Sequence, residues 1–220
     1  MDGACVGGLA VLTSNEVVYA LPPETHFDPK KTRGVPTANT TNVHMRMVGG
    51  RRVKGAGEKA QGGYSNCFLG KHENKWFSGV PHFGRVRFPE AYPGLDVVFY
   101  ATRRNVEYDF IVKPGADPSV IELAFDGLTR VDEKGDLTVS RGGKSFRQHR
   151  PRVFQGATEI EASFRLTEKG TVKVDVGDFD HSFPLRVDPV LDFSTYLGGS
   201  GADGFSDLVV SSDGNPVLTG

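Results

Sequence analysis

The stretch that decides the fold is LDVVFYATRRNVEYDFIV, residues 95–112. In its second half every other residue is large and apolar: Val106, Tyr108, Phe110 and Val112. A period of two residues is typical of a β-strand with one buried face. The apolar run 95–100 precedes it and polar residues 102–105 lie between them, so the sequence predicts a β-hairpin. Pro93 and Pro114 delimit this hairpin, because proline cannot donate a hydrogen bond to a sheet.

The composition extends this prediction to the whole chain. Its 220 residues include 28 Gly and 13 Pro, and residues so unfavourable to helices disfavour long helical segments. A hydrophobic content of 38% and an aromatic content of 10% exclude a disordered chain. The apolar runs are too short for a transmembrane helix. The net charge of −1 indicates neither a nucleic-acid nor a membrane partner.

Further strands are predicted on both sides of the central hairpin. Residues 9–13 and 17–21 flank a short polar turn and predict a second hairpin, and residues 43–47 alternate like a strand. Residues 49–63 are rich in Gly, Lys and Arg, and we expect a mobile loop there. Between residues 120 and 187, short apolar runs recur about every ten residues, as in a β-sandwich. The expected fold is an all-β antiparallel sandwich or meandering sheet.

The charge distribution indicates a boundary near Asp188-Pro189. From Lys30 to Lys59 there are eight Lys or Arg residues and a single acid, whereas no Lys or Arg follows Arg186. We therefore divide the chain into a β-rich domain, residues 1–188, and a different segment, residues 189–220.

That last segment resembles a known repeat. Residues 194–203 read STYLGGSGAD, and DGN at 213–215 is followed by TG at 219–220. These motifs resemble the SBBP-type β-propeller repeat. A propeller needs about four to eight blades, so the resemblance implies that the chain contains only the incomplete start of one.

The preceding segment is similar to the domain of unknown function DUF7948, which commonly precedes such repeats in large bacterial proteins. The matching residues are 66–70, 75–76, 80–81, 85–87, 92–100, 107–110, 114–118, 184–185 and 188–191. The resemblance implies a secreted or cell-surface bacterial protein and supplies no catalytic residues. The first residues lack the charged and apolar regions of a secretory signal, so we expect a fragment lacking its true N-terminus, or else a cytoplasmic protein.

Two acidic residues of the central hairpin are candidates for catalysis. Glu107 and Asp109 lie two apart on one strand, which places both carboxylates on one face about 6–7 Å apart. That spacing overlaps the range used by glycoside hydrolases. The alternative is a polar sheet face whose acids pair with Arg103, Arg104 or Arg87.

Metal-binding candidates lie in the C-terminal segment. Asp203, Asp207 and Asp213, with Asn215, supply the oxygen ligands that Ca²⁺ prefers, close to glycine turns. They form no EF-hand loop, and Asp in a β-turn commonly binds its own backbone instead. The six histidines show no zinc-binding spacing. Cys5 and Cys67 form no diagnostic pattern, and whether they pair is left open.

Two further features indicate possible ligands. Arg51, Arg52 and Lys54 form a basic cluster for a polyanion, although no aromatic residues are interleaved for base stacking; the alternative is a solvated loop. Trp76 and Phe77 form either a carbohydrate platform or part of the core.

The sequence thus favours a non-enzymatic structural or interaction module without a cofactor, whose partner is an extracellular protein or a polysaccharide. The alternatives are a polysaccharide hydrolase using Glu107 and Asp109, and a polyanion binder using the basic cluster.

Overall fold

The computed structural model describes residues 10–21, 41–68, 76–101, 106–192, 207–210 and 216–219. Within these ranges the protein consists of antiparallel β-strands, and a 3₁₀ turn at Pro118–Val120 is the only helical element. The predicted all-β antiparallel fold is confirmed. None of the described residues forms a helix that is long and apolar enough to cross a membrane.

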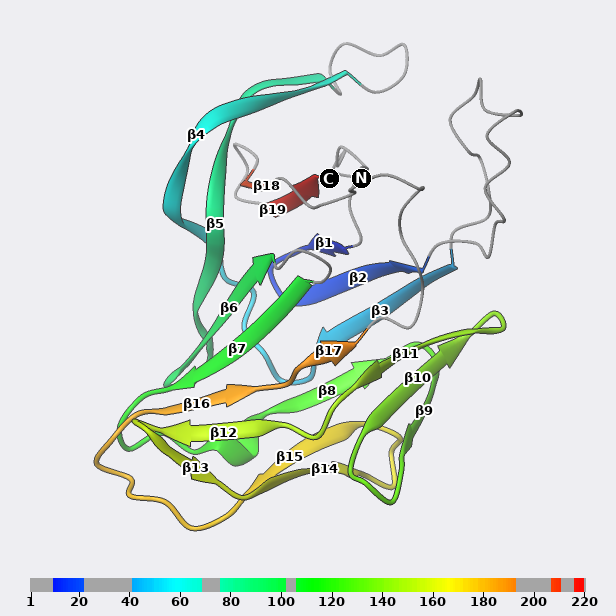
Figure 1. Ribbon diagram of the computed structural model, residues 1–220, viewed down its shortest axis with the longest axis vertical. Coiled ribbons are helices and arrows are strands. Elements are labelled where there is room, and N and C mark those ends of the chain that lie inside the picture. The colour runs from blue at the N-terminus through cyan, green and yellow to red at the C-terminus, as the bar shows by residue number, and fades with distance from the viewer. Residues whose placement is uncertain are drawn as a thin grey trace.

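The strands form one large curved sheet and one small sheet (Figure 1). The large sheet has the order β13-β12-β16-β7-β6-β5-β18-β19-β1-β2-β3-β8-β15-β14, and β4 pairs with β5 beside this path. Its strands are β1 (Ala10–Leu12), β2 (Glu16–Leu21), β3 (Thr41–Met47), β4 (Ala56–Phe68), β5 (Trp76–Tyr92), β6 (Leu95–Ala101), β7 (Val106–Val112), β8 (Glu122–Phe125), β12 (Arg152–Gln155), β13 (Thr158–Ile160), β14 (Ala162–Leu166), β15 (Val172–Val176), β16 (Leu185–Asp188), β18 (Asp207–Val210) and β19 (Pro216–Thr219). The small sheet contains β9 (Leu128–Val131), β10 (Leu137–Arg141), β11 (Lys144–Gln148) and β17 (Leu191–Asp192).

The central hairpin has the predicted form. β6 and β7 pair along their whole length, from Leu95 opposite Val112 to Ala101 opposite Val106. The alternating apolar residues of β7 are at most 1% exposed: Val106, Tyr108, Phe110 and Val112. The period of two therefore identified the buried face correctly.

The small sheet packs over the large one through aromatic and polar contacts. Phe146 of β11 lies with its ring centroid 5.4 Å from that of Tyr19 in β2. Gln148 of the same strand is fully buried and donates from Nε2 to the Tyr108 hydroxyl at 3.0 Å. Residues of both sheets thus share a single hydrophobic core.

The predicted mobile loop at 49–63 is wrong in its second half. β4 begins at Ala56, and from there the segment pairs with β5. Glycine has a low intrinsic preference for β-strands, but tertiary context can outweigh such a preference. Here the backbone hydrogen bonds to the long strand β5 hold the glycine-rich segment in a strand.

The two C-terminal strands enter the large sheet. β18 pairs with β5, with Leu208 opposite Phe83, and β19 pairs with β1, with Val217 opposite Val11. Strands from both sides of residue 188 therefore share one sheet. The division into two domains at this residue stays a prediction.

Candidate functional site

The β4–β5 hairpin extends beyond the core of the molecule (Figure 1). Its strands are 13 and 17 residues long. The pairing shifts register between Ala60 and Tyr64, and again between Ser65 and Cys67. Such bulges bend a hairpin and increase its twist, which accounts for the curved shape of this one.

A close contact fixes the hairpin toward its base. A Cβ atom at Gly57 would lie only 2.5 Å from the ring of Phe83. The ring therefore occupies the space that any other side chain at residue 57 would need. This is a position where glycine is required by packing rather than by backbone conformation.

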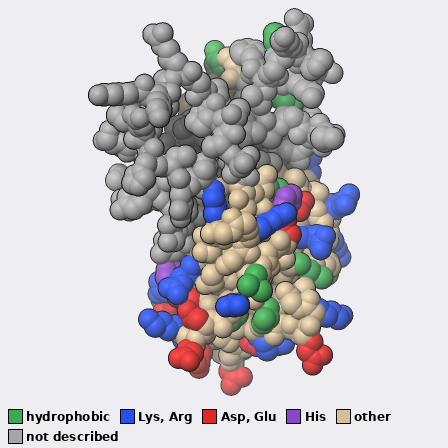
Figure 2. Space-filling view, turned by 90° about the vertical axis from the view of Figure 1, so that its right-hand side faces the viewer, with side chains coloured by type: hydrophobic (Ala, Val, Ile, Leu, Met, Phe, Trp, Pro, Cys, Tyr) green, Lys and Arg blue, Asp and Glu red, His purple; other side chains and the backbone are tan. Residues whose placement is uncertain are grey.

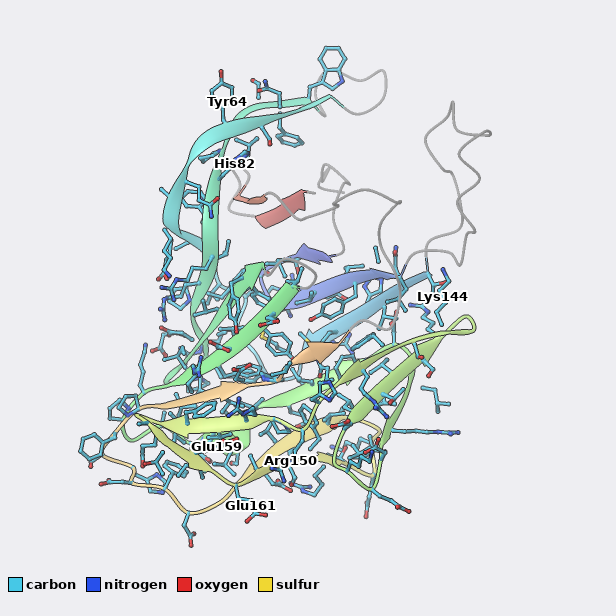
Figure 3. The ribbon with its side chains drawn as sticks, viewed as in Figure 1. Tyr64, His82, Lys144, Arg150, Glu159 and Glu161 are labelled. Atoms are coloured by element: carbon cyan, nitrogen blue, oxygen red, sulfur yellow. The ribbon has the colours of Figure 1, made fainter. Side chains whose placement is uncertain are left out.

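Two aromatic side chains are exposed toward the far end of the hairpin. Tyr64 is 68% exposed and Trp76 is 40% exposed. In Figure 3, Tyr64 projects away from the outside of the bend, whereas His82 lies on its inside. The interpretation of Trp76 as a core residue is wrong, because the hairpin carries it away from the core. Phe77 is partly buried in the same strand.

A serine and a histidine meet within the bend. Ser65 Oγ lies 2.7 Å from His82 Nε2, and His82 is 8% exposed. A serine beside a histidine is one component of a nucleophilic site, but a buried imidazole also needs such a partner for purely structural reasons. No sequence pattern predicts this pair, since the bulges bring it together.

The basic cluster lies at the other end of the same hairpin, directly before β4. Arg51, Arg52 and Lys54 are all exposed. The backbone N–H of Arg51 donates to Ala91 O at 2.7 Å, and its side chain lies 3.8 Å from Glu90. The predicted residues are thus brought together, but on a segment whose backbone is attached to β5.

Acidic residues next to this cluster hold an ion-pair network. Lys113 pairs with both Glu90 and Asp96, and the Asp96 carboxylate lies 3.1 Å from Arg87. Burial alone would raise the pKa of Asp96, but hydrogen bonds from the Glu90 backbone, Lys113 and Arg87 outweigh it and lower this pKa. Arg87 also donates to Glu58 of β4 at 2.6 Å. The network connects β4, β5 and β6 at the base of the hairpin.

The carboxylates proposed for catalysis lie in a polar sheet face. Asp109 is 8% exposed, accepts a hydrogen bond from the Tyr100 hydroxyl at 3.1 Å and lies 3.8 Å from Arg186. Burial, aided by the charge of Asp188, raises the pKa of Asp109 to about 6. Glu107 lies on the same strand and is partly exposed.

Asp188 is a member of this face that the sequence did not identify. It follows Val187, which pairs with Phe110, and its Oδ1 atom is buried without a hydrogen-bond partner among the described residues. Arg186 lies 3.9 Å from its other oxygen. The arrangement fits a polar sheet face of acids beside an arginine, but that arginine is Arg186 and not Arg87, which pairs with Glu58 and Asp96. The other two predicted partners, Arg103 and Arg104, lie outside the described residues, and the hydrolase stays a hypothesis.

The calcium prediction is not tested. Asp203, Asp213 and Asn215 lie outside the described residues, and for Asp207 only its place at the start of β18 is described. Over the described ranges no group of three or more His, Cys, Asp or Glu residues is placed to hold a metal ion. Cys5 also lies outside the described residues, so its pairing with Cys67 stays open.

Comparison with known proteins supports one part of the sequence interpretation. Residues 4–190 match the family described as a domain of unknown function, DUF7948. No curated protein and no solved structure matches the chain. The predicted similarity to this family is therefore confirmed over residues 4–190, and the propeller repeat stays a prediction.

Proposed function

The chain belongs to the DUF7948 family, whose function is unknown, and we propose that it is a non-enzymatic interaction module that contacts its partner through the far end of the β4–β5 hairpin. The observation that carries this proposal is the exposure of Tyr64, at 68%, and of Trp76, at 40%, on an element that projects from the core. Tyrosine and tryptophan dominate binding energy at interfaces, because each combines a large apolar surface with a polar group.

The backbone of the hairpin supports the same proposal. Among the described strands, only β5 pairs with β4. The opposite edge of β4 therefore presents backbone groups that are not used within the described sheet. Exposed edges of this kind are common sites of protein and peptide binding.

The cellular context forms part of the proposal. We place the module in a secreted or cell-surface bacterial protein, with residues 189–220 as the start of an SBBP-type propeller repeat. The support is the repeat-like sequence at 194–203, together with the antiparallel pairing of β18 with β19.

The single tryptophan of the chain provides a direct test. Trp76 fluorescence is measured while the protein is titrated with laminarin, xyloglucan and heparin as soluble polysaccharide probes. Binding at the hairpin is expected to shift the emission to shorter wavelengths, and Tyr64→Ala to weaken binding about tenfold, the loss typical of a modest hot spot.

Phe183→Ala provides the matched control. Phe183 is 58% exposed but belongs to the segment before β16 rather than to the hairpin, so its removal is expected to leave the affinity unchanged. The proposal is wrong if none of the probes changes the emission, or if Phe183→Ala weakens binding as much as Tyr64→Ala does.

A further inference from the structure

The basic cluster belongs to a segment that is fixed to the protein core. Residues 48–55 connect β3 to β4, and a hydrogen bond from Gly50 N–H to Met47 O closes the turn at the start of this connection at 3.2 Å. The Arg51 N–H then bonds to Ala91 O. The segment is therefore attached to the neighbouring strand where the cluster begins.

Two further contacts fix the rest of the segment. Val53 packs against the hydrophobic core. A Cβ atom at Gly55 would lie 2.9 Å from Val86 Cγ1 and 3.0 Å from the ring of Phe88, so the backbone approaches the core as closely as glycine allows. Arg52 and Lys54 alternate with these anchored residues and are both exposed.

These cations differ from those of the small sheet. Figure 2, which views the molecule from the side of β9 and β10, shows Lys and Arg side chains among Asp and Glu side chains. There Arg141 pairs with Asp126, and Arg147 pairs with Asp132 at 3.1 Å. In contrast, neither Arg52 nor Lys54 forms an ion pair with a described residue, and Arg51 has only the 3.8 Å contact to Glu90.

We propose that Arg51, Arg52 and Lys54 form a preorganised binding surface for an anionic polysaccharide. Because the backbone of the segment is already ordered, binding costs only side-chain freedom, so each contact contributes more than one from a mobile loop would. Arg52 and Lys54 form no ion pair with a described residue, and Glu90, the acid beside Arg51, is already paired with Lys113. The cluster therefore keeps positive charge that complements the sulfate or carboxylate groups of such a chain.

The same observations argue against a nucleic acid as the partner. Residues 51–55, RRVKG, contain no aromatic side chain on which a base can stack. The isoelectric point of the chain is about 6.6, whereas nucleic-acid-binding domains are commonly strongly basic. The basic surface is local, so a few sulfate or carboxylate groups of a polysaccharide suffice to match it.

This inference names the partner class of the proposed interaction module and so rests on that function, but it concerns different residues. The test measures binding of the full chain to immobilised heparin, as the sulfated probe, and alginate, as the carboxylated probe, at several salt concentrations. The variant Arg51→Gln/Arg52→Gln/Lys54→Gln removes the cluster. The control Arg130→Gln/Lys134→Gln/Lys169→Gln removes three exposed cations elsewhere, for the same change in net charge.

The cluster variant is expected to bind at least one of the two probes at least about tenfold more weakly than the wild type. The salt dependence, measured as the slope of log affinity against log salt concentration, is expected to decrease in magnitude by about two to three, roughly one for each cation removed. The control is expected to stay within about twofold of the wild type. A heparin-only response assigns the surface to sulfate, and an alginate-only response to carboxylate.

Three results would overturn the proposal: equal losses in both triple variants, no loss in the cluster variant, or tighter binding of a 20-base-pair DNA duplex than of either polysaccharide. Thermal unfolding of both variants verifies that they are folded. If Tyr64→Ala has no effect while the cluster variant loses binding, the proposed function of the hairpin end is wrong and the basic surface is supported. If Tyr64→Ala weakens binding while the cluster variant does not, the basic surface is wrong and the function of the hairpin end is supported.

Discussion

The two long hairpins of the large sheet, β6–β7 and β4–β5, share antiparallel pairing but differ in how far their side chains are buried. In β6–β7 the apolar residues alternate regularly, and Tyr108 and Phe110 are fully buried. In β4–β5 the register shifts twice, glycines replace large side chains, and Tyr64 is 68% exposed. The β6–β7 hairpin therefore forms part of the hydrophobic core, whereas the far end of β4–β5 extends beyond it.

The difference shows that pairing alone does not determine what a hairpin contributes to stability. Burial of aromatic side chains stabilises β6–β7, since each buried ring removes a large apolar area from water. The far end of β4–β5 lacks that burial, and nearer its base the geometry depends on local contacts such as Phe83 on Gly57. We therefore expect mutations in the two hairpins to have very different effects on the free energy of unfolding.

The largest expected effect comes from Phe110→Ala in β7. Phe110 is fully buried and its ring contacts Tyr108, with 5.7 Å between centroids. Removal of a buried phenylalanine side chain is expected to lower the free energy of unfolding by about 3–5 kcal/mol, because a cavity is left behind. Urea denaturation monitored by circular dichroism measures this loss.

Tyr64→Ala in β4 is the paired measurement, and its expected cost is within about 0.5 kcal/mol, as for most surface substitutions. A comparable loss in the two variants would contradict the comparison and would mean that the far end of β4–β5 is part of the stabilising core.

An intermediate effect is expected at Gly57. A methyl group there would overlap the ring of Phe83, so Gly57→Ala is expected to cost about 1–3 kcal/mol of unfolding free energy through overpacking. In the background of Phe83→Ala the ring is absent and the same substitution is expected to cost much less. Additive losses in the double variant, measured by urea denaturation, would show that the contact is not the cause.

The sequence predicted those strands in which apolar residues alternate regularly with polar ones, because this alternation indicates which face is buried. The alternation in residues 106–112 and in residues 43–47 identified β7 and β3, because one face of each strand packs on the core. β4 was missed because its glycines and bulges remove that period. Its strand conformation depends instead on pairing with β5. The pairing of β4 with β5 therefore left no local signal in residues 56–68.

For the candidate site, the sequence indicated which residues to consider but not the contacts that position them. The exposed Arg51, Arg52 and Lys54 are visible in the sequence, but their anchoring by Val53 and Ala91 is not, since Ala91 is distant along the chain. Similarly, Asp109 was identified by its spacing from Glu107, whereas Asp188 joins it only through the pairing of β16 with β7. Such contacts arise from strand order, which the sequence did not reveal.

The smallest expected effect concerns the polar face of β7 and carries a distinctive pH dependence. Burial raises the pKa of Asp109 to about 6, above the value of about 3.9 expected in the unfolded chain. A raised carboxyl pKa means that the ionised form is disfavoured on folding, so this group destabilises the native state above pH 6 and ceases to do so as the pH falls toward 4. Asp109→Asn is therefore expected to stabilise the protein at pH 8 by on the order of 1 kcal/mol after allowance for solvent screening, with no gain near pH 4.

Asp96→Asn, on the adjacent strand β6, provides a control of opposite sign. The hydrogen bonds from the Glu90 backbone, Lys113 and Arg87 outweigh burial and lower the pKa of Asp96, so its ionised form stabilises the native state at neutral pH, and this contribution is lost as the pH falls through the lowered pKa. The variant is expected to be less stable than the wild type at pH 8, with a difference that shrinks in acid. Urea denaturation at pH 8, 6 and 4 measures both curves. If Asp109→Asn instead destabilises the protein at pH 8, then Arg186 and Tyr100 compensate fully for the burial of Asp109, and the polar face of β7 stabilises the hairpin as its apolar face does.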